Sequence, residues 1–320
     1  MSHVEKQNDE TESWPMKSMN VTIELAKLDE KIRAFLPPQY QHCYGSVSPT
    51  SMGSAGLIYG DDGKVAWEQI WTSFCDLALA GGPPHRGKLL EPVSEADVAA
   101  ESERYAEVVT ELTRAIRLTT GVKVAESTPG WVDMKCSSVE EASWLQFAIT
   151  AENVTARRKQ RTLQLPAGPA FRVEKEIKNV VVALAKTLHY WDSHLTLTQQ
   201  ALAGDEVWEA APPTAADLPA HQQAREEMEA GLRAAGLSPL DRKYTGWVGI
   251  ETPEEQDAVW ILRAVLVDQV LARREENILY LPVHAEPDPA KNARVIETIS
   301  YAWDLWVAHS FQKRKWARKT

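Results

Sequence analysis

The chain has 320 residues, of which 44% are hydrophobic and 25% are charged, and its formal net charge is −10. A chain of this length and composition can bury a sizeable core in one or more globular domains without needing disulfides or metals. The acidic balance argues against non-specific binding to nucleic acid, because the phosphates require a basic protein surface.

Cysteine usage and the N-terminus indicate the compartment. The cysteines are Cys43, Cys75 and Cys136, an odd number without a closely spaced pair, so we expect neither a disulfide framework nor a thiolate zinc site. No apolar run reaches the length of about 18 residues that a membrane span requires, and the N-terminus lacks the pattern of a signal peptide. We expect a cytoplasmic protein with no membrane contact.

In the N-terminal third, a polar start is followed by mixed helix and strand signals. Residues 1–16 are expected to form a disordered tail. Apolar periodicity predicts the following elements: helices over 21–35, 65–80 and 96–118, and short strands at 56–59 and 88–90. The third helix follows Ser94, a residue type favoured at helix N-caps.

An internal repeat occupies the rest of the chain. Residues 130–166 align with residues 246–282 at a constant shift of 116, and thirteen of the thirty-seven aligned positions are identical. The identities include two tryptophan pairs, one of them Trp144 with Trp260. We interpret the repeat as a duplication. A third, degenerate copy around residues 67–82 is a further hypothesis.

Both copies predict the same order of elements. The first copy predicts strands at 131–136 and 163–165, and helices over 140–158 and about 172–201. The second copy predicts strands at 247–251 and 279–281, and helices over 254–275 and about 290–312. Ser138 with Glu141 has the spacing of a capping box, and Thr252 before Pro253 is the expected N-cap in the second copy.

Short strands alternating with long helices predict an α/β fold made of duplicated strand–helix–strand–helix units, triplicated if the third copy is real. Such units imply right-handed crossovers, and we favour two packed layers related by a pseudo-two-fold axis. The expected organisation is a tail (1–16), a divergent α/β unit (17–120), a repeat copy (121–202), a linker (203–217) and a second repeat copy (218–320).

The most unusual stretch is Ala80–Gly87, in which two glycines and two prolines precede His85 and Arg86. Gly81 and Gly82 after a helix are a typical stop signal. Histidine also suits general acid–base chemistry near neutral pH, and arginine suits an anionic ligand. The hypothesis is therefore a site in which His85 is the acid–base group, Arg86 binds an anion, and Gly81 and Gly82 line the ligand.

A loop upstream supplies the other candidate site residues. Residues 46–56 are small and hydroxylated, and backbone amides in such loops can bind phosphate. The order of elements does not match a phosphate-binding loop, so the loop is interpreted as a pocket wall or a mobile lid. The ligand-contacting candidates are Ser46, Ser48, Thr50 and Ser51, and Cys43 is the candidate reactive group.

Three other patterns favour structural readings. The pairs Arg157–Arg158 and Arg273–Arg274 could clamp an anion, but they are expected at helix C-termini, where cations complement the helix dipole. His189 and His194 are five residues apart, which aligns them poorly on a helix, so packing is favoured over a metal site. Cys75 is interpreted as a buried, inert thiol.

The leading hypothesis is a small-molecule enzyme or ligand-binding protein that acts on an anionic metabolite, with its site in the N-terminal third. The alternative is a non-catalytic accessory subunit, in which long helices and faces rich in the 12 tryptophans bind a protein partner or a second copy of the chain. The basic end, residues 313–319, leaves nucleic-acid binding as a third hypothesis. The sequence contains no signature of a known cofactor, and it leaves catalysis undecided.

Overall fold

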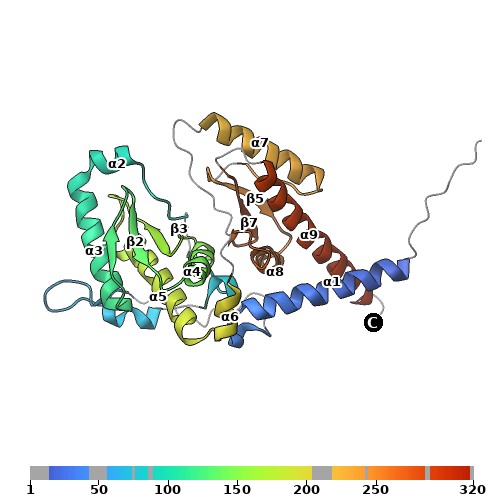
Figure 1. Ribbon diagram of the computed structural model, residues 1–320, viewed down its shortest axis with the longest axis horizontal. Coiled ribbons are helices and arrows are strands. Elements are labelled where there is room, and N and C mark those ends of the chain that lie inside the picture. Colours follow the sequence, from blue (N-terminus) through green and yellow to red (C-terminus); the bar gives the residue numbers. More distant parts are fainter. Residues whose placement is uncertain are drawn as a thin grey trace, which may run out of the picture.

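The computed structural model describes residues 14–42, 56–73, 76–85, 89–203, 218–241, 244–284 and 289–317. Within these ranges the protein is a mixed α/β structure with small antiparallel sheets. Two α/β units, residues 95–202 and 218–317, form most of the fold and lie side by side in Figure 1. We call them the first unit and the second unit.

The first unit packs helices against a sheet with the strand order β1-β2-β4-β3. Its helices are α2 (Glu95–Ala100), α3 (Ser102–Thr120), α4 (Val139–Ala151), the π-helical turn η4 (Val173–Ile177), α5 (Lys178–Ser193) and α6 (Leu197–Leu202). Its strands are β1 (Val124–Glu126), β2 (Trp131–Lys135), β3 (Arg157–Lys159) and β4 (Thr162–Pro166).

The second unit has the strand order β5-β7-β6. Its helices are α7 (Leu218–Ala234), α8 (Glu255–Leu266) and α9 (Pro289–Ala317), and its strands are β5 (Trp247–Glu251), β6 (Arg273–Glu275) and β7 (Ile278–Pro282). Helix α9 packs on both α7 and α8. Figure 1 shows that α1 (Trp14–Phe35) runs beneath the second unit and reaches α6 of the first, and it contacts α6, α8 and α9.

The two sheets have matching registers. Trp131 of β2 pairs with Pro166 of β4, and Trp247 of β5 pairs with Pro282 of β7. Every ladder in these sheets is antiparallel. The expectation of right-handed crossovers between parallel strands is therefore wrong. The strands predicted before and after α4 and α8 are present as β2, β4, β5 and β7. Between each helix and the strand that follows it lies one further strand, β3 or β6, which forms an antiparallel hairpin with that following strand.

Strands β3 and β6 are not among the predicted elements, because the two helices before them end earlier than expected. Helix α4 ends at Ala151 and α8 ends at Leu266, and soon afterwards Asn153 and Gln269 both adopt a left-handed φ of 63°. A second matched pair, Gln160 and Glu276, has a φ of 52° in the hairpin turns. None of these positions holds a glycine, the usual signal for such a conformation. The arginine pairs consequently lie on β3 and β6, not at helix C-termini.

Capping explains where the helices begin. The Ser138 hydroxyl accepts a hydrogen bond from the backbone N–H of Glu141 at 3.1 Å, as expected for the N-cap of α4. In the second unit the N-cap is Glu254, not Thr252. The Thr252 hydroxyl is instead bonded at 2.8 Å to the carbonyl oxygens of Glu254 and Asn277. Ser94 caps α2 as predicted.

The N-terminal third departs most from expectation. The helix predicted over 65–80 is wrong: the chain forms two 3-10 helices, η2 (Trp67–Ser73) and η3 (Ala78–Ala80). The predicted strands at 56–59 and 88–90 contribute only isolated bridges, Tyr59 with Val65 and Leu90 with Val154. A third 3-10 helix, η1 (Pro38–Tyr40), follows α1. These short elements are held by contacts with the two units, which local sequence patterns do not reveal.

Longer predicted helices are subdivided in the structure. The helix expected over 96–118 is α2 followed by α3, and the helix expected over about 172–201 is η4, α5 and α6 in succession. The core contains Trp144 and Trp260, which are 1% and 4% exposed. Trp260 stacks against Trp306 of α9 with ring centroids 5.0 Å apart, so these tryptophans pack inward. Among the helices that the structure describes, none combines the length and apolarity needed to cross a bilayer.

Candidate functional site

A short segment, residues 76–85, crosses between the two units, and we call it the junction segment. Its helix η3 contacts α4 on one side and α8 on the other. Leu77 and Leu79 are fully buried there. Arg263 of α8 donates hydrogen bonds to the carbonyl oxygens of Leu79 and Ala80. The buried backbone of the junction segment is therefore satisfied by a buried guanidinium of the second unit.

Gly81 and Gly82 meet two geometric requirements of this segment. Gly81 ends η3 with a φ of 99°, a conformation that L side chains rarely adopt. A Cβ atom on Gly82 would lie 2.2 Å from the carbonyl oxygen of Asp76. The carbonyl oxygen of Gly82 accepts a hydrogen bond at 2.9 Å from Nη2 of Arg274. The interpretation of these glycines as a stop signal thus has a structural basis.

A buried ion pair anchors the junction segment to the first unit. Lys186 of α5 and Glu152, the C-cap of α4, are 1% and 0% exposed at the side chain, with Nζ and Oε2 2.8 Å apart. Glu152 Oε1 also accepts from the backbone N–H of Ala78 at 2.8 Å, and Nζ of Lys186 donates to the carbonyl oxygen of Asp76 at 3.2 Å. Two opposite charges removed from water are thus paired and hydrogen-bonded.

His85 lies at the end of the junction segment and is partly buried. Its ring hydrogen-bonds to the Asn179 backbone, while Nε2 is enclosed without a hydrogen-bond partner. Burial, and then the positive charge of Lys186, lower the pKa of His85 to about 3. This environment favours the neutral form of the imidazole, and the acid–base role expected from the sequence stays a prediction.

Asn153 joins the junction segment to the second unit. Its Nδ2 donates to the carbonyl oxygens of Arg274 at 3.2 Å and His85 at 3.4 Å. Its Oδ1 accepts from Nη1 of Arg273 at 2.9 Å. The left-handed backbone at Asn153 is thus placed where one side chain bridges α4, β6 and the junction segment.

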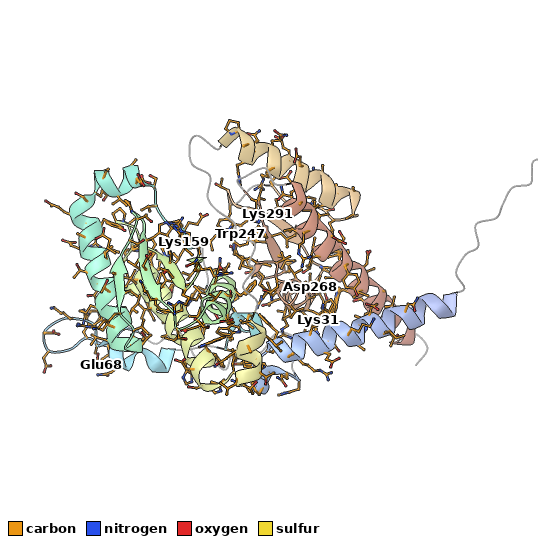
Figure 2. All side chains as sticks on the ribbon, in the orientation of Figure 1. Lys31, Glu68, Lys159, Trp247, Asp268 and Lys291 are labelled. Carbon is orange, nitrogen blue, oxygen red and sulfur yellow. The ribbon has the colours of Figure 1, made fainter. Side chains whose placement is uncertain are left out.

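Arg273 of β6 is the most distinctive charged residue in this region. Its side chain is 0% exposed, and its guanidinium carbon lies 4.2, 4.3 and 5.0 Å from the ring centroids of Tyr280, Tyr244 and Trp247. Nη1 is bonded to Asn153 and Glu275, but Nε and Nη2 have no hydrogen-bond partner. Within the part of the chain that the structure describes, two parallel donors on one edge of this buried guanidinium are therefore unpaired, and we call this the open edge of Arg273. Figure 2 shows Trp247 on the side of the second unit that faces the first.

The surroundings of Arg273 include two carboxyl groups. Glu275 accepts from Nη1 of Arg273 at 2.9 Å and from the Tyr244 hydroxyl, which in turn accepts from the backbone N–H of Leu89. Burial raises the pKa of Glu91, and this effect is larger than the opposite effect of the positive charge of Arg273. The site thus combines one cation, one paired carboxylate and one carboxyl that takes up a proton more readily than usual.

At the same position in the first unit, the Nε donor of the arginine is paired. Arg157 of β3 lies 3.9 Å from the ring centroid of Trp131, and its Nε donates to Oε1 of Gln164 at 2.7 Å. Gln164 also donates to Asp133 at 2.6 Å. The corresponding residues in the second unit are Tyr280 and Gly249, which carry no side-chain amide or carboxylate.

The residues predicted from sequence are only partly brought together. His85, Gly81 and Gly82 lie on the junction segment, while Cys43, Ser46, Ser48, Thr50, Ser51, Arg86 and Cys75 lie outside the described residues. Cys136 is buried, and burial raises the pKa of its thiol to about 12. The sequence patterns do not indicate the surroundings of Arg273. The one relevant difference in the sequence is that Gln164 of the first copy is replaced by Tyr280 in the second, while the arginines are the same.

Comparisons with known proteins identify no family. No family model and no curated protein matches this chain. A solved structure described as SPT with a PLP internal aldimine is 14% identical, with a TM-score of 0.25, over 44% of this chain and 35% of that one. A substituted form of SPT with PLP gives 14% identity and a TM-score of 0.26, over 46% and 37%. The matches span little more than a third of each SPT chain, and at such TM-scores they carry no argument.

Proposed function

We propose that the protein binds a small monoanionic ligand, of the carboxylate class, at Arg273 between the two units. The observation that carries this proposal is the open edge of Arg273, whose Nε and Nη2 are buried and unpartnered. Leaving buried donors of a charged group unsatisfied is costly. A carboxylate matches two parallel guanidinium donors with a bidentate pair of hydrogen bonds.

The charges around Arg273 favour a monoanion over a phosphate dianion. Nη1 of Arg273 already donates a hydrogen bond to Glu275, and the carboxyl of Glu91 lies nearby. A dianion would bring two negative charges towards these groups, whereas a carboxylate brings one. The raised pKa of Glu91 means that a ligand carboxylate and Glu91 could share a proton as like charges approach.

The aromatic rings around Arg273 indicate the chemistry of the rest of the ligand. Tyr244, Trp247 and Tyr280 surround the guanidinium, and the two tyrosine rings pack edge to face at 5.3 Å. An apolar body attached to the carboxylate would find its partners in these rings. Because Arg273 is enclosed, binding requires one of the rings, or the chain around Leu89, to move aside.

This proposal moves the anion-binding role from Arg86 to Arg273 and keeps the site beside the N-terminal third, which contributes Leu89 and Glu91. His85, Cys43 and the hydroxyl side chains of residues 46–51 remain proposed as further ligand contacts. We also propose that the units arose by duplication. The matching registers and the paired left-handed residues support that reading.

The test is a thermal-shift and native mass-spectrometry screen with small carboxylates and phosphates. We expect an aromatic or aliphatic monocarboxylate to raise the melting temperature. Arg273→Lys keeps the charge but loses the bidentate fork, so it should weaken binding by tenfold or more. Arg157→Lys is the matched control and should bind normally.

Two outcomes would contradict the proposal. Binding that survives Arg273→Lys unchanged would place the ligand elsewhere. A protein that binds no anion but purifies as a stable dimer, or with a protein partner, would favour the accessory-subunit alternative. The exposed leucines of α6, Leu197 at 84% and Leu202 at 62%, would then be the first surface to mutate.

A further inference from the structure

The end of α5 holds two histidines whose ring nitrogens converge. Nε2 of His189 and Nε2 of His194 lie 3.2 Å apart, and the ring centroids are 5.0 Å apart at an interplanar angle of 78°. Spacing of five residues on a regular helix would point the rings apart. Here α5 ends at Ser193, and His194 is the C-cap with φ −125° and ψ −23°, which turns its ring back towards His189.

We propose that His189 and His194 form a two-histidine binding site for a divalent transition metal of the zinc class, with water completing the coordination. Zinc lies about 2.0–2.1 Å from each histidine nitrogen, so two nitrogens at a tetrahedral angle are about 3.3 Å apart. The observed separation matches this value closely. Without metal, a proton shared between the two nitrogens satisfies the same geometry, and the metal would replace it.

The rings are held in place by their neighbours. Tyr190 packs against both histidines, with centroid distances of 5.0 Å to His194 and 6.1 Å to His189. The Tyr190 hydroxyl lies 2.6 Å from that of Tyr40, which donates to Asp76 at 2.8 Å. The histidine rings therefore pack on a tyrosine whose hydroxyl is hydrogen-bonded to Tyr40, and Tyr40 in turn bonds to the junction segment.

Charge around the pair also suits a cation. Asp192 is exposed on the same turn and interacts electrostatically with His189. The structure shows no group of three or more His, Cys, Asp or Glu suited to a metal within its described ranges. The site is therefore a two-ligand site, and we expect moderate affinity.

The test is calorimetric titration of the full-length, untagged protein with Zn²⁺ alone at pH 7.5. We expect one zinc equivalent, with affinity at least tenfold weaker in both His189→Gln and His194→Gln. His42→Gln is the control, because His42 is exposed and lies outside the pair. Circular dichroism checks that each variant is folded.

A second measurement separates a metal site from a hydrogen-bonded pair. Zinc bound to the wild type should be removed by excess EDTA, and the same titration with Mg²⁺, which prefers oxygen ligands, should show no binding. No zinc binding in the wild type, or binding that is unchanged in either His189→Gln or His194→Gln, would overturn the proposal.

Discussion

Arg157 and Arg273 hold the same register position in their sheets, yet only Arg157 has its Nε donor paired within the described part of the chain. Nε of Arg157 donates to Gln164 at 2.7 Å, whereas the guanidinium of Arg273 packs against aromatic rings and its Nε has no hydrogen-bond partner. The residue opposite each arginine, Gln164 or Tyr280, makes the difference. Arg157 therefore links two strands of its sheet through Gln164, whereas Arg273 keeps two donors unpaired.

This relationship predicts the effect of restoring the first unit's residue in the second. Tyr280→Gln should place an amide oxygen within reach of Arg273 Nε and block anion binding, because the open edge is then occupied. Gln164→Leu should leave anion binding unchanged and cost about 1 kcal/mol of stability. Calorimetry with the ligand found in the screen, and urea unfolding, measure the two effects. Normal binding by a folded Tyr280→Gln variant would contradict the prediction.

The buried ion pair predicts a large loss of stability when one partner is removed. Glu152→Gln leaves the ammonium of Lys186 buried without its counter-charge and should cost about 3–5 kcal/mol. Adding Lys186→Met to the same chain should recover much of that loss. Urea unfolding followed by circular dichroism gives the free energies.

Asp268 provides the matched control for that experiment, since it occupies the position of Glu152 in the second unit. It pairs with Lys31 of α1 at 2.9 Å, but the two side chains are 25% and 59% exposed, and Figure 2 shows them next to one another where α1 passes the second unit. Asp268→Asn should therefore cost less than about 1 kcal/mol. Equal losses for Glu152→Gln and Asp268→Asn would show that the burial of Lys186 does not matter energetically.

Gly82 predicts a steric effect. Gly82→Ala would place a Cβ atom 2.2 Å from the Asp76 carbonyl oxygen, so the junction segment must shift, at a cost of about 1–3 kcal/mol or more. Gly56→Ala is the control, because its Cβ would meet nothing within 4 Å. The midpoints of thermal unfolding compare the two variants. A wild-type midpoint for Gly82→Ala would mean that the segment packs less tightly.

His85 predicts a dependence of stability on pH. Its pKa is about 3 in the folded protein against an ordinary value of 6.5, so the unfolded chain binds the proton first as the pH falls. The contribution of neutral His85 is present in full above about pH 6.5 and is lost progressively towards pH 3. Relative to His85→Gln, the wild type should lose up to about 1.4 kcal/mol of stability per pH unit between pH 6 and pH 4. Urea unfolding gives the free energy of unfolding of both proteins at each pH. If the two free energies changed equally with pH, His85 would be exposed.

The cysteines predict a pattern of chemical labelling. Burial raises the pKa of Cys136 to about 12, so its thiol should resist iodoacetamide at pH 8 in the native protein. Cys43 remains the predicted reactive thiol and should be labelled first. Peptide mapping by mass spectrometry identifies the labelled residues, and labelling in denaturant confirms that all are detectable. Rapid native labelling of Cys136 would contradict its burial.

Sequence by itself determined the elements whose signals are local. The strands that begin at Trp131 and Trp247, the capping of α4 by Ser138, and the correspondence between residues 130–166 and 246–282 all follow from short-range patterns. Apolar alternation, capping side chains and repeated residues act over a few positions, so they can be recognised without knowing the fold.

Only the tertiary structure decided where chain segments meet. Local patterns do not predict the strands that carry Arg157 and Arg273, because Asn153 and Gln269 adopt a left-handed backbone without being glycine. His194 faces His189 because α5 ends at Ser193 and His194 is its C-cap. The open edge of Arg273 exists because rings from distant positions enclose it while no acceptor does. Burial and hydrogen-bond satisfaction are properties of the assembled neighbourhood, so no reading of one segment reveals them.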